Sequence, residues 1–110
     1  MGAPVIYTYE TNQKENQMTN PTYPTKQDLV SQLMKVKTAI HQTYDIPYSN
    51  KQLVRMNTVC DGWDNLTAKQ IQNQLDLVRI NLHADYGVDI DSNESGLISD
   101  VMVLVDLAKK

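Results

Sequence analysis

The chain has 110 residues, which is the size of one domain, and its hydrophobic content of 41% fits an ordinary globular protein. Its formal net charge of −3 excludes a general binder of nucleic acids or anionic membranes, because such proteins carry a basic face. The single cysteine excludes an intrachain disulfide, and the most apolar stretch, residues 101–108, is too short to span a bilayer. We therefore expect a cytoplasmic protein that has no membrane partner.

Residues 1–23 are expected to form a flexible N-terminal tail. The segment TNQKENQMTNPT, residues 11–22, offers almost nothing to bury, so it cannot offset the entropy that ordering would cost. The preceding APVIYTYE is typical of a strand, but the rest of the chain offers it no partner strand. We therefore place the folded domain at residues 24–110.

Past residue 24 the spacing of apolar residues becomes helical, and four helices are predicted at residues 25–43, about 50–61, 67–86 and about 92–108. Thr25 and Thr67 are the expected N-caps of the first and third helices, and Gly62 and Gly87 are expected stop signals. The residues expected to face inward are Leu29, Leu33, Val36, Ile40 and Tyr44, then Leu53, Met56, Cys60 and Trp63, then Ile71, Leu75, Val78, Leu82 and Tyr86. The fourth helix is apolar nearly all round and is expected to be the most buried, with a strand over VMVLV as the alternative.

The first and third helices resemble each other when the sequence is shifted by 42 residues. Six of twenty positions are then identical: Thr25/Thr67, Gln32/Gln74, Leu33/Leu75, Val36/Val78, His41/His83 and Tyr44/Tyr86. Amphipathic helices align their apolar residues in any case, but that does not explain the matching Thr, Gln, His and Tyr. The loops that follow align only if small gaps are allowed. The pattern predicts an all-α fold, a four-helix bundle built from two duplicated helix–loop–helix hairpins, residues 24–62 and 65–110.

The acid-rich run DIDSNESGLISD, residues 89–100, is the nearest approach to a chemical motif. A calcium loop starting at Asp91 would use Asn93 and Ser95 but would have a methionine at the twelfth position, where a bidentate carboxylate belongs. A loop starting at Asp89 recovers Asp100 at that position but loses the turn glycine. A helix cap explains the same residues, so we expect no metal or cofactor here, and Asp89, Asp91, Asn93, Ser95 and Asp100 remain weak metal candidates.

Other candidate chemistry is sparse. His41 and His83 are the only histidines and match in the repeat, so they could begin a metal site or a pH switch, but each lies at the edge of its apolar stripe and is expected at the boundary of the core. No catalytic arrangement is evident, and we expect no enzyme. A helix-turn-helix DNA reader around residues 66–80 is a further alternative, which the acidic balance disfavours.

The sequence therefore predicts a small, non-enzymatic protein–protein interaction module. Accessory, immunity and regulatory factors of bacterial or phage systems include helical bundles of this size, an analogy of class only. The candidate interaction residues are Tyr44, Tyr48, Trp63, Tyr86, His41 and His83, with core packing the favoured role for Trp63 and Tyr86. A degenerate calcium-binding module and a DNA-binding regulator are the alternatives. The partner is expected to be another protein, nucleic acid is an improbable partner, and self-association is also compatible with the sequence.

Overall fold

The computed structural model describes residues 24–109, and within that range it contains helices and no strand. The helices are α1 (Lys26–Tyr44), α2 (Lys51–Asp61), α3 (Ala68–Tyr86) and α4 (Asn93–Ala108), with a short 3-10 helix, η1 (Trp63–Asn65), after α2. The prediction of four helices is confirmed, and the predicted boundaries agree to within about one residue. The tail expected at residues 1–23 lies outside the described residues.

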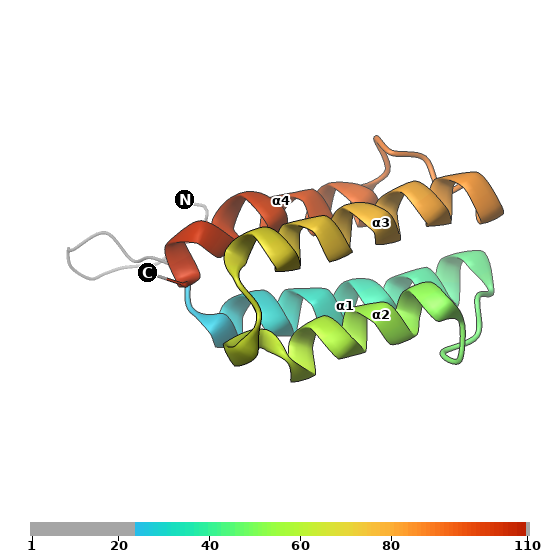
Figure 1. The fold of residues 1–110 in the computed structure, drawn as a ribbon. Coiled ribbons are helices and arrows are strands. Elements are labelled where there is room, and N and C mark those ends of the chain that lie inside the picture. The colour runs from blue at the N-terminus through green and yellow to red at the C-terminus, as the bar shows by residue number, and fades with distance from the viewer. Residues whose placement is uncertain (1–23, 110) are drawn as a thin grey trace, which may run out of the picture.

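The four helices run up and down alternately around one core (Figure 1). In sequence order each helix packs beside the next, and α4 packs beside α1, so the arrangement closes. The loops that join α1 to α2 and α3 to α4 lie at the same end of the bundle (Figure 1). The connection between α2 and α3 lies at the opposite end, which we call the connection end.

Local chemistry sets the helix ends. The side chains of Thr25 and Thr67 each accept a hydrogen bond from the backbone N–H of the residue three positions later. The side chains of those later residues, Asp28 and Gln70, in turn accept a hydrogen bond from the backbone N–H of the cap. The predicted N-caps are therefore confirmed, and each is part of a capping box. Gly87 ends α3 in the left-handed conformation, with φ of +69°.

The core consists of one apolar face from each helix. Its buried side chains include four of the five predicted for α1, Leu29, Leu33, Val36 and Ile40, and four of the five predicted for α3, Ile71, Leu75, Val78 and Leu82. The fifth predicted residue of α1, Tyr44, is half-buried and packs against the core. Each Leu, Ile or Val buried in this way contributes about 1.5–3 kcal/mol relative to an exposed side chain. The core, rather than helix propensity, therefore supplies most of the stability of these helices.

Two packing expectations are wrong, those for Cys60 and Tyr86, and those for α4 are met. In α2, Val59 is the fully buried residue and Cys60 is only partly buried, because the helix is rotated slightly from the predicted face. The stretch VMVLV is helical, as predicted, and α4 has the smallest share of exposed residues among the four helices, although Val103 is 70% exposed. Tyr86 is also exposed, because the last turn of α3 extends beyond the core.

The two halves of the bundle match at a constant offset of 42 residues. Helices α1 and α3 have 19 residues each, and the N-caps of α2 and α4, Asn50 and Ser92, are also 42 residues apart. The small gaps expected in the loops are therefore not needed. Buried side chains continue the match through α2 and η1 in the first half and through α4 in the second, in the pairs Leu53/Ser95, Met56/Ile98, Val59/Val101 and Trp63/Val105.

Candidate functional site: the loop end

Five of the six candidate interaction residues lie at one end of the bundle, which the α1–α2 and α3–α4 loops share (Figure 1). We define the loop end as residues 41–51 and 83–94. The sixth candidate, Trp63, is 1% exposed and belongs to the core near the connection end. Its ring therefore fills the core and does not contribute to a binding surface.

Both loops of the loop end are built in the same way. Each helix ends in a left-handed residue, Asp45 (φ +56°) or Gly87, and the next residue is a buried anchor, Ile46 or Val88. A four-residue turn follows, closed by a backbone hydrogen bond of 2.9 Å between its first and last residues, at 47–50 and again at 89–92. Because each loop is anchored in the core and closed by a turn, its exposed side chains are held in defined positions.

The two histidines reinforce the same loops. His41 Nδ1 lies 2.7 Å from the carbonyl oxygen of Ile46, and His83 Nδ1 lies 3.2 Å from that of Val88. Each imidazole therefore bridges the last turn of its helix to the buried anchor of the loop. The histidines belong to different hairpins, and each bonds within its own loop. In residues 24–109, no three His, Cys, Asp or Glu side chains gather closely enough to hold a metal ion.

Tyrosine hydroxyls tie each hairpin to the other. Tyr44, from α1, donates to Oε1 of Glu94 in the first turn of α4, at 3.4 Å. Tyr86, at the matching position of α3, accepts from Nδ2 of Asn50, the N-cap of α2, at 2.6 Å. The loop end is therefore cross-linked in both directions by polar contacts.

Tyr48 is the most constrained of the exposed aromatic side chains. Its ring stacks on His41 with the centroids 3.9 Å apart, and Lys37 Nζ lies 5.4 Å from its centroid. It is nevertheless 43% exposed, as is Ile90, which occupies the matching position of the other loop. Ile90 is not among the predicted candidates, because an alignment with small gaps in the loops does not pair it with Tyr48, which lies 42 residues earlier.

The loop end also holds much of the acidic charge. It contains five carboxylates, Asp45, Asp85, Asp89, Asp91 and Glu94, and one lysine, Lys51. The rest of residues 24–109 has six carboxylates and seven Lys or Arg side chains. In this described range, the two ion pairs are Lys26–Asp64 and Asp76–Arg79, and neither involves a carboxylate of the loop end. The negative charge of the described residues is therefore concentrated at one end of the bundle.

The weak metal candidates do not converge. Asp89 Oδ1 accepts the N–H of Asp91, and the connection between α3 and α4 has only six residues where a calcium loop has twelve. Ser95 is buried, and its hydroxyl accepts from Nε of Arg79, so a cationic group already occupies that side of it. Asn93 begins α4, and Asp100 lies seven residues farther along, about 10 Å away along the helix.

The side chains that would have suited a DNA-reading helix mostly have intramolecular partners. Gln70 completes the capping box of α3, and Gln72 donates to the carbonyl oxygen of Met102 on α4. Arg79 bonds Ser95 and pairs with Asp76. Gln72 and Arg79 are therefore engaged with α4, whereas Gln70 is exposed on another side of α3.

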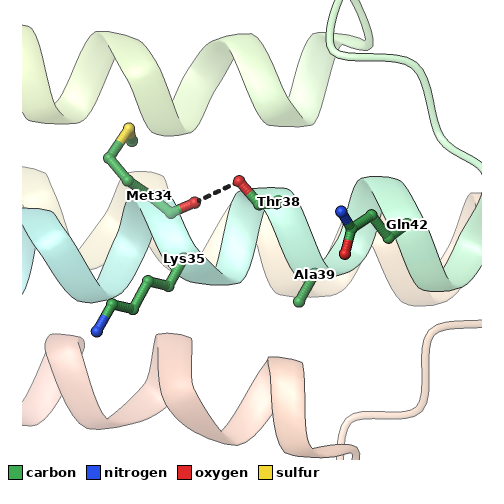
Figure 2. Close-up of a pocket in the computed structure, with 5 residues that line it drawn as sticks. All are labelled: Met34, Lys35, Thr38, Ala39 and Gln42. Carbon is green, nitrogen blue, oxygen red and sulfur yellow. Dashed lines mark hydrogen bonds between the residues drawn. The ribbon is translucent and has the colours of Figure 1, made fainter.

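Two hollows that are lined by described residues lack the chemistry of a catalytic pocket. A hollow of about 370 Å³ runs along α1, and Figure 2 shows that its lining side chains, from Met34 to Gln42, all come from that helix, with Met34 and Lys35 pointing in opposite directions. A second hollow, of about 340 Å³, lies between α1 and α4 and is lined by Asp28, Ser31, Gln32, Lys35 and Leu97. Neither brings a base and a nucleophile together.

Cys60 is poorly suited to react. Burial, and to a smaller extent the neighbouring carboxylate of Asp61, raise the pKa of the thiol from 9.0 to about 11, while Lys37 acts in the opposite direction. The thiolate is the nucleophilic form, so little of it is present at neutral pH. The geometry supports the interpretation of Cys60 as a small packing residue.

None of the helices in residues 24–109 is long and apolar enough to cross a membrane. Comparisons of the chain with models of protein families, with curated protein sequences and with solved structures found no match.

Proposed function

We propose that the protein is a small, non-enzymatic module that binds another protein through its loop end, as an accessory, immunity or regulatory factor does. The observation that carries this proposal is the pair Tyr48 and Ile90, one in each loop, both 43% exposed. Loops usually present small polar residues to water, whereas large aromatic and aliphatic side chains are typical anchors of protein interfaces. Tyr86 is 45% exposed and adds a third such side chain at the same end.

The rigidity of the loops supports the same function. A loop that is already ordered loses little entropy on binding, so more of the contact energy contributes to affinity. The stacking of Tyr48 on His41 and the Tyr86–Asn50 hydrogen bond fix two anchors before a partner arrives. The exposed apolar side chains elsewhere, Val54, Leu77, Ile80 and Val103, lie on helices, and Val103 is ten residues, or about 15 Å, beyond the start of α4.

We also infer that the bundle arose by duplication of one helical hairpin. Support comes from the constant offset of 42 residues in caps, buried positions and turns, and from polar contacts that match across it. Gln32 donates to the carbonyl oxygen of residue 97, and Gln74 accepts from Arg55, so both the glutamines and their partners are 42 residues apart. The loop end then presents two related copies of one surface.

Site-specific photo-crosslinking in the source cells tests the proposed function. A photoreactive amino acid replaces Tyr48 in one variant and Val103 in the control, which is exposed but lies away from the loop end. We expect one protein to be crosslinked in stoichiometric amounts from position 48 but not from 103. Added wild-type protein should compete, and the double variant Tyr48→Ser, Ile90→Ser should not. Equal crosslinking from both positions, or competition by the double variant, contradicts the proposal.

A further inference from the structure

The folding of the chain does not explain two carboxylates of the loop end. Glu94 lies in the first turn of α4, and Asp89 and Asp91 lie in the loop just before it, on the side of the helix dipole that favours negative charge. Asp45 and Asp85 lie instead at the C-terminal ends of helices. Asp45 follows directly after α1, and Asp85 is the penultimate residue of α3, so both lie at a negative dipole end that favours cations.

Asp45 carries a second cost because its φ of +56° is a conformation in which an L-residue other than glycine is strained. Its counterpart in the other hairpin, Gly87, avoids that strain. Both Asp45 and Asp85 are exposed, and in residues 24–109 neither is a member of the two ion pairs. These two carboxylates therefore lower the stability of the fold. Residues that serve binding often lower stability in this way.

We propose that the partner's contact segment is a basic polypeptide stretch that bears an apolar side chain. The occupant of the loop end follows from its charge, because five carboxylates and one lysine share this end of the bundle with the exposed Tyr48, Tyr86 and Ile90. Arg or Lys side chains pair with the carboxylates, and the apolar side chain packs on the tyrosines. This inference rests on the proposed function and specifies the class of its partner.

The test uses the full-length protein labelled with nitrogen-15 and a short soluble peptide of arginine, leucine and serine as the probe. The matched probe has glutamate in place of arginine. We expect the arginine peptide to shift backbone resonances in residues 41–51 and 83–94, more strongly at low salt, and the glutamate peptide to shift none. Shifts spread equally over the acidic residues of the connection end overturn the inference.

Two double variants make the test specific. Asp45→Asn, Asp85→Asn removes the charges that oppose folding, and Asp61→Asn, Asp100→Asn removes two exposed charges outside the loop end. The first should bind the arginine peptide roughly threefold to thirtyfold more weakly, the loss expected for two exposed charge pairs. It should also unfold at a higher temperature than the wild type, an outcome that a purely structural role does not give. The second should bind as the wild type does.

The failure of this inference is distinguishable from that of the proposed function. If the crosslinked protein is still captured by the Asp45→Asn, Asp85→Asn variant but not by the Tyr48→Ser, Ile90→Ser variant, the loop end is the interface and a basic partner is excluded. If neither variant affects capture, both proposals fail. Loss of capture in both variants, with the higher unfolding temperature in the first, supports both.

Discussion

Substituting alanine for each described glycine in turn should change stability in three different ways. Gly96 lies within α4, and a Cβ atom added there meets no atom within 4 Å. Glycine inside a helix is about 0.5–1 kcal/mol less favourable than alanine. Gly96→Ala should therefore raise the free energy of unfolding by about that amount, and raise the melting temperature by about 3–6 °C.

The other two glycines provide the contrast. Gly87 has φ of +69°, where alanine is strained, so Gly87→Ala should cost about 1–2 kcal/mol even though its added Cβ also meets nothing. At Gly62 an added Cβ would lie 3.2 Å from the carbonyl oxygen of Thr58. That crowding should offset the entropic gain from a stiffer unfolded chain and leave the change within about 0.5 kcal/mol of zero.

Urea unfolding followed by circular dichroism measures all three values, with an unchanged slope against denaturant as the control for two-state behaviour. The sign at Gly96 is decisive. In a calcium loop starting at Asp91 this glycine would form the sharp sixth-position turn, and alanine would destabilise the loop and weaken calcium binding. A destabilised Gly96→Ala variant, or a neutral Gly87→Ala variant, would refute our description of this half of the bundle.

Three further predictions follow from the core and the caps. The pKa of Cys60 is raised from 9.0 to about 11, so at pH 8 its thiol should react with Ellman's reagent about 100-fold more slowly in the folded than in the unfolded protein. The free energy of unfolding should also fall as the pH rises from 9 through 11. Equal reaction rates in the two states would contradict this. Leu33→Ala and Leu75→Ala, at matching and fully buried positions, should each lower the free energy of unfolding, measured in urea, by about 2–5 kcal/mol. A neutral result at either position would show that the two hairpins do not have matching cores. Asp45→Gly should stabilise the fold by up to about 1 kcal/mol, and a loss would show that Asp45 makes an unrecognised stabilising contact.

The sequence predicts the helices well because their signals are local. Capping boxes at Thr25 and Thr67 and the stop at Gly87 depend on residues within three or four positions of each other, so they can be read without knowing the fold. The stripes of α1 and α3 repeat over five turns, which fixes the face that turns inward.

The predictions from the sequence fail where tertiary packing decides which side chain is buried. Whether Val59 or Cys60 faces inward depends on a small rotation of α2, which its neighbours set and the sequence does not. Tyr86 continues the stripe of α3 but lies one turn past the last buried residue, Leu82, so the pattern cannot show that the core has already ended. The offset of 42 residues in the loops follows from the N-caps Asn50 and Ser92, whose positions the structure shows and the sequence does not.

The candidate site was only partly visible in the sequence. Tyr44, Tyr48, Tyr86 and the histidines could be chosen as interface residue types, but their meeting at one end depends on the up-and-down topology. The acidic residues attracted attention as a calcium motif along the chain. The geometry instead sets Asp45 and Asp85, from different hairpins, at two helix ends that disfavour them.

Hydrogen exchange of the protein, free and in the complex recovered by crosslinking, tests the central claim most directly. We predict that the partner slows exchange of backbone amides in residues 45–50 and 87–92, the two loops, and leaves the connection end unchanged. If the loops exchange equally in both states and protection falls instead on the outer faces of α3 or α4, the loop end is not the interface.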